Sequence, residues 1–156
     1  MFKRVMWATD GLEAADTALP YAKALVPADG VLLAVHCKEF LVAAAKGGAH
    51  PLRADEPELQ TKIRNQVAQV RTEGITAELR LASGVSPARS IAKAAAELGA
   101  DVIVVGTRGH GAIAGLLTGN TTRRLLHIAP CPVVAVGPGA KPVFPARREP
   151  AVKKAA

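Results

Sequence analysis

The sequence has few aromatic side chains. They make up 3% of its 156 residues, although 49% of the residues are hydrophobic. A buried core must therefore consist mainly of Ala, Val, Leu and Ile, and such cores are typical of parallel strands covered by alanine-rich helices. No apolar run approaches the roughly 18–20 residues that span a membrane. These absences favour one α/β domain, as the length of the chain also suggests.

Cysteine is also scarce. Cys37 and Cys131 are the only two cysteines, too few for a disulfide framework, and we expect both to be buried thiols. Together with the four histidines they show no spacing typical of metal ligands, so we expect no metal held by the protein alone. The N-terminal residues carry charge from Lys3 onward, too early for a secretory signal peptide. We therefore expect a cytoplasmic protein without membrane contact.

The net charge of +7 is concentrated at the C-terminus. Residues 141–156 hold five cationic residues against Glu149, a net charge of +4, which leaves +3 for the rest of the chain. Aromatic residues that could stack on bases are not interleaved with these cations, so we expect no specific nucleic-acid binding. We assign residues 1–137 to one domain and residues 138–156 to a solvated, basic, Pro-rich tail. Weak adhesion of the tail to anionic surfaces is the alternative.

Five short runs that are apolar or alternate in polarity predict β-strands, and four amphipathic stretches predict helices. The strands are expected at residues 4–8, 31–35 (extending to 37 at most), 76–82, 102–105 and 132–136. The helices are expected to begin near residues 13, 55, 87 and 120 and to end near residues 26, 74, 99 and 130. Asp55 and Ser86 are candidate N-cap residues, and Pro20 predicts a kink in the first helix. Residues 38–54 are predicted to form an irregular excursion.

The alternation of strands and helices predicts a five-stranded parallel sheet with helices on both faces. Right-handed crossovers limit the topologies, and we infer the strand order 3-2-1-4-5. The third strand alternates between apolar and charged residues, which is typical of a half-exposed edge strand.

A glycine-rich segment follows the fourth strand and is the most distinctive part of the chain. It contains Gly106, Gly109, Gly111, Gly115 and Gly119, and a helix start at Asn120-Thr121-Thr122 comes directly after it. A strand, a glycine loop and a helix N-terminus together can bind phosphate through free backbone N–H groups and the helix dipole. An ordinary surface loop is the alternative.

Two well-known phosphate motifs do not fit this segment. The spacing Gly106-x4-Gly111 is that of a P-loop, but Ala112-Ile113 stands where Lys and Ser or Thr are required. The pattern Gly109-x-Gly111-x-x-Ala114 resembles a dinucleotide fingerprint, yet no helix begins there and it does not follow the first strand.

The pattern Gly106-x2-Gly109-x9-Gly119, with Thr122 and the later run Ala129 to Val134, resembles the ATP-binding branch of the universal stress protein family. In that branch Ser or Thr follows the last glycine, whereas Asn120 stands here. The resemblance covers roughly residues 3–137. It implies the adenine nucleotide alpha-hydrolase-like fold, with the same strand order.

The first and fourth strands are expected to end side by side, because the winding of the sheet reverses between them. Asp10 and Gly106 would then meet at one crevice. Asp10 could accept hydrogen bonds from a ribose or base, or could cap the first helix. The resemblance implies that Asp10 contacts the nucleoside and that the backbone of Val35 meets adenine. The expected phosphate contacts are Gly106, Gly109, Gly119, Asn120, Thr121 and Thr122; Arg108 could add charge, and Ala8 and Thr9 are backbone candidates.

The sequence shows no catalytic constellation near the glycine segment. Phosphoryl transfer requires a metal-binding carboxylate and a positioned nucleophile, so we expect binding of ATP, AMP or cyclic AMP, with Mg²⁺ held through phosphates, and at most very slow hydrolysis. The resemblance implies a homodimer through Pro132 to Val136 that responds to nucleotide in stress and acts on an unknown protein partner. A partner-binding dimer without nucleotide, favoured by Asn120, and an enzyme of the wider nucleotide α-hydrolase-like group are the alternatives.

Overall fold

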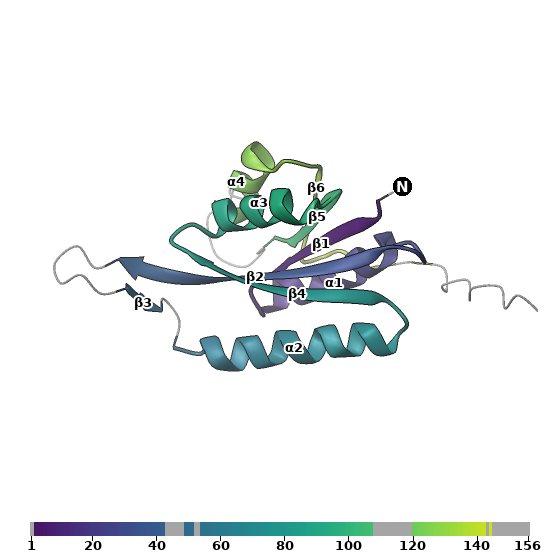
Figure 1. Cartoon of the computed structure of the whole chain (residues 1–156), viewed down its shortest axis with the longest axis horizontal. Helices are drawn as coiled ribbons and strands as arrows, with labels where there is room; N and C mark the ends of the chain where they lie inside the picture. The colour runs from purple at the N-terminus through teal and green to yellow at the C-terminus, as the bar shows by residue number, and fades with distance from the viewer. Residues whose placement is uncertain (1, 43–48, 52–53, 108–119, 143, 145–156) are drawn as a thin grey trace, which may run out of the picture.

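The computed structural model describes residues 2–42, 49–51, 54–107, 120–142 and 144. Strands and helices alternate along most of the chain (Figure 1). The elements are β1 (Arg4–Thr9), α1 (Glu13–Leu25), β2 (Val31–Val42), β3 (Ala49–Pro51), α2 (Glu56–Thr72), β4 (Thr76–Gly84), α3 (Pro87–Leu98), β5 (Val102–Gly106), α4 (Asn120–Ile128) and β6 (Val133–Val136).

Five parallel strands form the sheet in the order β4-β2-β1-β5-β6. These are the third, second, first, fourth and fifth predicted strands, so the predicted order is confirmed. β1 lies at the centre, with Ala8 in register with Val35 on one side and Val105 on the other. Within the described part of the chain, β4 and β6 each pair with a single strand, and the prediction that the third strand is an edge strand is therefore confirmed.

Helices cover both faces of the sheet (Figure 1): α1 and α2 lie on one face, and α3 and α4 on the other. Successive residues of β1 serve opposite faces, since Met6 packs with the α3 side and Trp7 with the α1 side. The Trp7 side chain is fully buried, and its indole N–H donates to the Ala15 carbonyl at 3.0 Å. Small Ala side chains on α1 and α3 let both helices approach the strands closely.

The predicted excursion over residues 38–54 is partly wrong. β2 continues to Val42, and β3 pairs with its far end in antiparallel fashion, with Leu41 opposite His50. Residues 43–48, 52 and 53 lie outside the described part of the chain. The apolar run from Phe40 sustains strand pairing here, so β2 extends well past the end of β1, as Figure 1 shows.

Several local expectations also need correction. Asp55 and Ser86 occupy N-cap positions, but neither side chain makes a capping hydrogen bond. Cys37 and Cys131 are free thiols, as expected, but they are half-buried rather than fully buried. Helix α1 runs through Pro20, and the kink there remains a prediction.

The beginning of the predicted tail packs on the domain. Ala140 lies against the core on the α1 side, and the Phe144 ring makes an edge-to-face contact with Tyr21, with ring centroids 5.1 Å apart. A hydrophobic anchor therefore joins the basic C-terminal segment to α1. In the described residues, no helix has the length and apolar character needed to cross a membrane.

Candidate functional site

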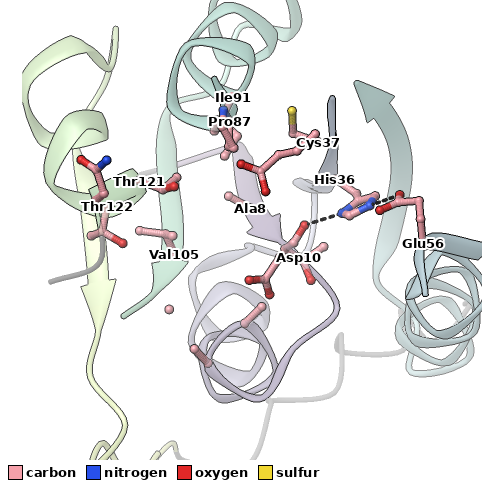
Figure 2. A pocket seen from close by; sticks show the side chains of 16 residues that line it. Ala8, Asp10, His36, Cys37, Glu56, Pro87, Ile91, Val105, Thr121 and Thr122 are labelled. Carbon is pink, nitrogen blue, oxygen red and sulfur yellow. Dashed lines mark hydrogen bonds and ion pairs between the residues drawn. The ribbon is translucent and has the colours of Figure 1, made fainter. Parts of the chain in front are cut away.

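A cavity of about 280 Å³ opens at the carboxyl ends of β1, β2 and β5, where the winding of the sheet reverses. This volume is close to the roughly 300 Å³ at which small-molecule sites begin. Sixteen of the described residues line it (Figure 2). They are Ala8, Thr9, Asp10, Ala14, Ala15, His36, Cys37, Glu39, Glu56, Pro87, Ile91, Val105, Gly106, Asn120, Thr121 and Thr122.

Each of the four helices in the described part of the chain reaches this cavity with its N-terminal turn. Ala14 belongs to the first turn of α1, and Glu56, Pro87 and Asn120 are the first residues of α2, α3 and α4. Helices that follow parallel strands begin where the strands end, so their N-termini gather at one edge of the sheet. Free N–H groups and the helix dipoles make such a place favourable for anions.

Asp10 lies in the short connection between β1 and α1 and lines the cavity. Its carboxylate accepts a hydrogen bond from the backbone N–H of Leu12 at 2.9 Å, and Leu12 rather than Asp10 occupies the N-cap position of α1. The Thr9 hydroxyl accepts from the Gly11 N–H at 3.1 Å. These bonds fix a tight turn. Asp10 therefore stabilises the connection in which it lies and does not act as the N-cap of α1.

The predicted phosphate-binding side is partly described. Gly106, Asn120, Thr121 and Thr122 line the cavity together with Ala8 and Thr9, while Arg108, Gly109 and Gly119 lie outside the described residues. Thr122 is buried and Asn120 is exposed at the start of α4. The first and last parts of the predicted motif therefore meet Asp10 at a single cavity.

The expected contact between the backbone of Val35 and adenine stays a prediction, and the structure places Val35 away from the lining of the cavity. Val35 is fully buried and lies between Ala8 of β1 and Arg80 of β4, so it does not line the cavity. β1 ends opposite His36, and the next residue of β2 that lines the cavity is Cys37. Because β2 runs past β1, the first backbone groups without a β1 neighbour belong to Cys37, two residues beyond the predicted position.

A buried pair of titratable side chains borders the cavity and was missed in the sequence. His36 Nε2 lies 2.6 Å from Glu56 Oε1, and the two side chains are 3% and 6% exposed. His36 Nδ1 lies 2.9 Å from the carbonyl oxygen of Thr9, and both contacts are drawn in Figure 2. Twenty residues separate the pair, and no local pattern signals it.

Cys37 and Glu39, which also line the cavity, were missed because the sequence placed the end of the strand too early. Burial raises the pKa of the Cys37 thiol, and the nearby Glu39 and Glu56 carboxylates add to the rise. The thiol is therefore protonated near neutral pH. Glu56 and Pro87 could have been found, since both begin predicted helices and helix starts follow strand ends.

The two sides of the cavity differ in chemistry. Figure 2 places Thr121 and Thr122 on one side and His36 and Glu56 on the other, with Asp10 between them. On the first side amide and hydroxyl groups can donate to an anion, and on the second side carboxylates can accept from hydroxyl or amino groups. No group of three or more His, Cys, Asp or Glu residues in the described chain is arranged to hold a metal ion.

Comparisons with known proteins agree with this architecture. The model of the "Universal stress protein family" matches residues 1–137. A universal stress protein of Thermus aquaticus is 34% identical over 147 residues, covering 87% of this chain and 99% of the relative.

Two solved structures share the fold at lower identity. One is a universal stress protein in complex with cyclic AMP, with a TM-score of 0.63 and 22% identity, covering 88% of this chain and 98% of the other. Another is a family protein of Arabidopsis thaliana with AMP bound, with a TM-score of 0.62 and 18% identity, covering 86% and 91% of the two chains. At these identities the likeness shows the fold alone.

The sheet order defines a doubly wound α/β protein, and a cavity opens at the switch point of its sheet. With the match over residues 1–137 and the Thermus aquaticus relative, the chain belongs to the universal stress protein family.

Proposed function

We propose that this protein binds an adenine nucleotide in the cavity and acts in the cytoplasm as a nucleotide-responsive stress protein. The phosphates lie against Gly106 and the first turn of α4, and the nucleoside extends past Asp10 toward β2. ATP, AMP and cyclic AMP all carry the required chemistry, and Mg²⁺ would be held through the phosphates. A change in occupancy alters affinity for a protein partner only if the two conformations bind nucleotide differently.

One observation carries this proposal: an anion-favouring end and a carboxylate end occupy the same cavity. Asn120, Thr121 and Thr122 open α4 at one end, and Asp10 and Glu39 line the cavity as potential acceptors. A nucleotide combines a phosphate group with ribose hydroxyls and a base edge, so it uses both ends at once. The apolar surfaces of Pro87 and Ile91 suit the faces of a base.

The structural relatives give this proposal independent support. Two universal stress protein structures with this fold contain cyclic AMP or AMP. The nucleotide of this chain is our inference from its own residues, since the relatives share only 22% and 18% identity with it.

Calorimetry on nucleotide-free protein tests the proposal with ATP, AMP and cyclic AMP in the presence of Mg²⁺. We expect saturable heat with at least one of them. Asp10→Asn should weaken binding tenfold or more, because a hydrogen bond to a charged group contributes about 1.5–3 kcal/mol. Asp29→Asn is the matched control, since this exposed carboxylate pairs with Lys3 rather than lining the cavity. An absence of heat with all three ligands would refute the proposal.

A second experiment addresses the phosphate side. Gly109→Asp and Gly119→Asp each place a negative charge within the sequence motif that we expect to hold phosphate. Each variant should lose ATP binding while keeping its circular dichroism spectrum. Binding that survives both changes would show that this segment is not the phosphate site.

We infer binding rather than turnover. Among the described residues that line the cavity, we find no nucleophile hydrogen-bonded to a base, and both ring nitrogens of His36 already face Thr9 and Glu56. Phosphate release from ATP should therefore be far below the roughly 1–100 s⁻¹ of phosphotransferases. Steady release in that range would instead favour an enzyme of the wider nucleotide α-hydrolase-like group.

A second candidate is a partner-binding dimer that takes no nucleotide. Asn120 favours it, because the hydroxyl that follows the last glycine in the ATP-binding branch is absent here. Asn120→Ser should then create or strengthen ATP binding. If nucleotide-free protein binds no nucleotide but the Ser variant does, this second function is the better description.

We further propose that two copies associate through β6, as the family resemblance implies. In the described chain β6 pairs only with β5, so its outer edge offers backbone donors and acceptors to another strand. Pairing with the same edge of a second copy would satisfy these groups.

A further inference from the structure

The two backbone carbonyls that flank Asp10 are both held by side chains connected to α2. The Thr9 carbonyl accepts from His36, whose other ring nitrogen contacts Glu56 at the start of α2. The Gly11 carbonyl accepts from the Lys62 ammonium at 2.7 Å. Helix α2 is therefore linked to the backbone on both sides of Asp10, through Glu56 and His36 on one side and through Lys62 on the other.

Hydrogen-bond chemistry determines how many protons the His36–Glu56 pair carries. A carbonyl oxygen can only accept, so Nδ1 of His36 must carry a hydrogen to bond Thr9. The 2.6 Å contact between Nε2 and Glu56 then requires one further proton between these atoms. The pair contains the same number of protons whether it is an imidazolium with a carboxylate or a neutral imidazole with a carboxylic acid. In either form, one proton lies between Nε2 and Glu56.

Other polar groups face the same pair. Gln60 donates to Oε1 of Glu56 at 3.0 Å, and Asp10, Cys37 and Glu39 line the adjoining cavity. These neighbours supply no cation to replace the shared proton.

Lys62, which donates to the Gly11 carbonyl, also contacts other side chains. Lys62 pairs with Asp16 at 2.6 Å, and Gln66 donates to the other oxygen of Asp16 at 2.7 Å. Gly11 adopts a φ of +76°, and a Cβ atom there would come within 2.9 Å of Leu59 on α2. Polar and apolar contacts with α2 therefore fix the turn together.

We propose that His36 and Glu56 are positioning residues: through one shared proton they connect α2 to Thr9 and hold Asp10 in place for the nucleoside of the ligand. This inference rests on the proposed nucleotide site and adds a dependence of that site on proton occupancy. Lys62 provides a second hold on the same turn that does not use the shared proton.

Loss of the shared proton turns the attraction between His36 and Glu56 into repulsion. The lone pair of Nε2 would then face a carboxylate across 2.6 Å, and two acceptors repel each other in a site that water barely reaches. The pair opens, Thr9 loses its donor or its support, and Asp10 becomes less well placed. Affinity for the nucleoside therefore falls when the shared proton is lost.

Adenosine is the probe for this effect, because it carries no phosphate that titrates. Calorimetry follows its binding to the full chain from pH 6 to 8.5, while ¹⁵N NMR of labelled histidine shows where the pair loses its proton. We expect at least about a fivefold loss of affinity across that transition, the lower end of typical coupling between sites. The Cys37 thiol stays protonated over this range, because its pKa is raised from the ordinary value of 9.0.

Matched variants separate positioning from general structural support. In Glu56→Gln the amide can donate to Nε2 of a neutral His36, so adenosine binding should persist and lose its pH dependence. Glu56→Ala should weaken binding at every pH. Lys62→Met should also weaken binding but keep the pH dependence of the native protein, because the shared proton is untouched.

Wild-type pH dependence that survives Glu56→Gln, or full adenosine affinity in Glu56→Ala, would overturn the inference. A ligand-free readout covers the case in which no nucleotide or adenosine binds, which would refute the proposed function alone. The amide of Leu12 donates to Asp10, so its NMR signal reports the position of that carboxylate. This signal should move with the His36 proton in the native protein and remain still in Glu56→Gln, and any other outcome contradicts the positioning role.

Discussion

Gly106 lies against the first turn of α1 so closely that a Cβ atom at this position would overlap the carbonyl oxygen of Ala14. Packing between β5 and α1 therefore requires a glycine at the first position of the predicted phosphate motif, whether or not a ligand is present. The ends of β1 and β5 border the same cavity because these two strands pair in parallel.

Gly106→Ala tests this packing. The added methyl group meets backbone rather than a flexible side chain, so the strand or the helix must move, at a cost of about 1–3 kcal/mol. We expect a lower urea midpoint with an unchanged slope. Gly139→Ala is the control, since a Cβ atom there meets nothing within 4 Å. Equal stability of the two variants would contradict the close packing of β5 on α1.

Cys37 provides a chemical reporter of the cavity. Burial raises the pKa of this thiol above its ordinary value of 9.0, so the reactive thiolate is scarce at pH 8. Alkylation by iodoacetamide should be slower than that of a free cysteine and should accelerate only as the pH passes above 9. Bound ATP should slow it further, because Cys37 lines the proposed site.

Cys131 is the internal control for this experiment. Its pKa is also raised by burial, but it lies outside the cavity. Mass spectrometry resolves the two sites in one sample. Equal protection of both cysteines by ATP would indicate a general change in stability, and no protection of Cys37 would place the nucleotide elsewhere.

The edge of β6 can be blocked without disturbing its pairing with β5. Ile103 and Thr107 donate to the carbonyls of Pro132 and Val136, so the alternation of a parallel ladder directs the backbone of Ala135 to the open side. Ala135→Pro removes that outward N–H, a change that edge strands tolerate.

We expect light scattering at micromolar concentration to show a dimer for the native protein and a monomer for Ala135→Pro. Ala135→Ser keeps the N–H group and should remain dimeric. A monomeric native protein, or a Pro variant that stays dimeric, would exclude association through this edge.

We expect Asp101 to contribute to stability in a pH-dependent way. Its carboxylate accepts from the backbone N–H groups of Lys3 and Arg4 at 2.8 Å each, and these bonds lower its pKa from the ordinary value of 3.8. A lowered folded-state pKa means that the stabilisation is complete well above pH 3.8 and is lost as the pH falls through the folded value.

Asp101→Ala should therefore be less stable than the native protein at pH 7, and the difference should shrink as the pH falls below 4. Urea unfolding at several pH values measures it. Glu78→Gln, a change at an exposed carboxylate on β4, should leave the pH dependence as it is. A difference that stays constant down to acidic pH would show that the two backbone contacts do not depend on the charge of Asp101.

Most of the architecture could be predicted from local patterns. The apolar runs of β1, β5 and β6 and the amphipathic faces of α2 and α3 are signals within single elements, and together with the handedness of crossovers they restrict the strand order. The end of β2 was misjudged because strand length depends on what lies alongside. Phe40 to Val42 pair with β3, a partner that the sequence pattern does not reveal.

The sequence by itself determined the alternation of elements, the order of the sheet and the meeting of Asp10 with Gly106, because hydrophobic periodicity and chain chirality act locally or apply to all parallel sheets. Only the tertiary structure decided that Cys37 rather than Val35 borders the cavity, and that His36 and Glu56 are buried together. Such contacts depend on the distance between elements far apart in the chain, and the shared proton exists only because the fold removes both groups from water.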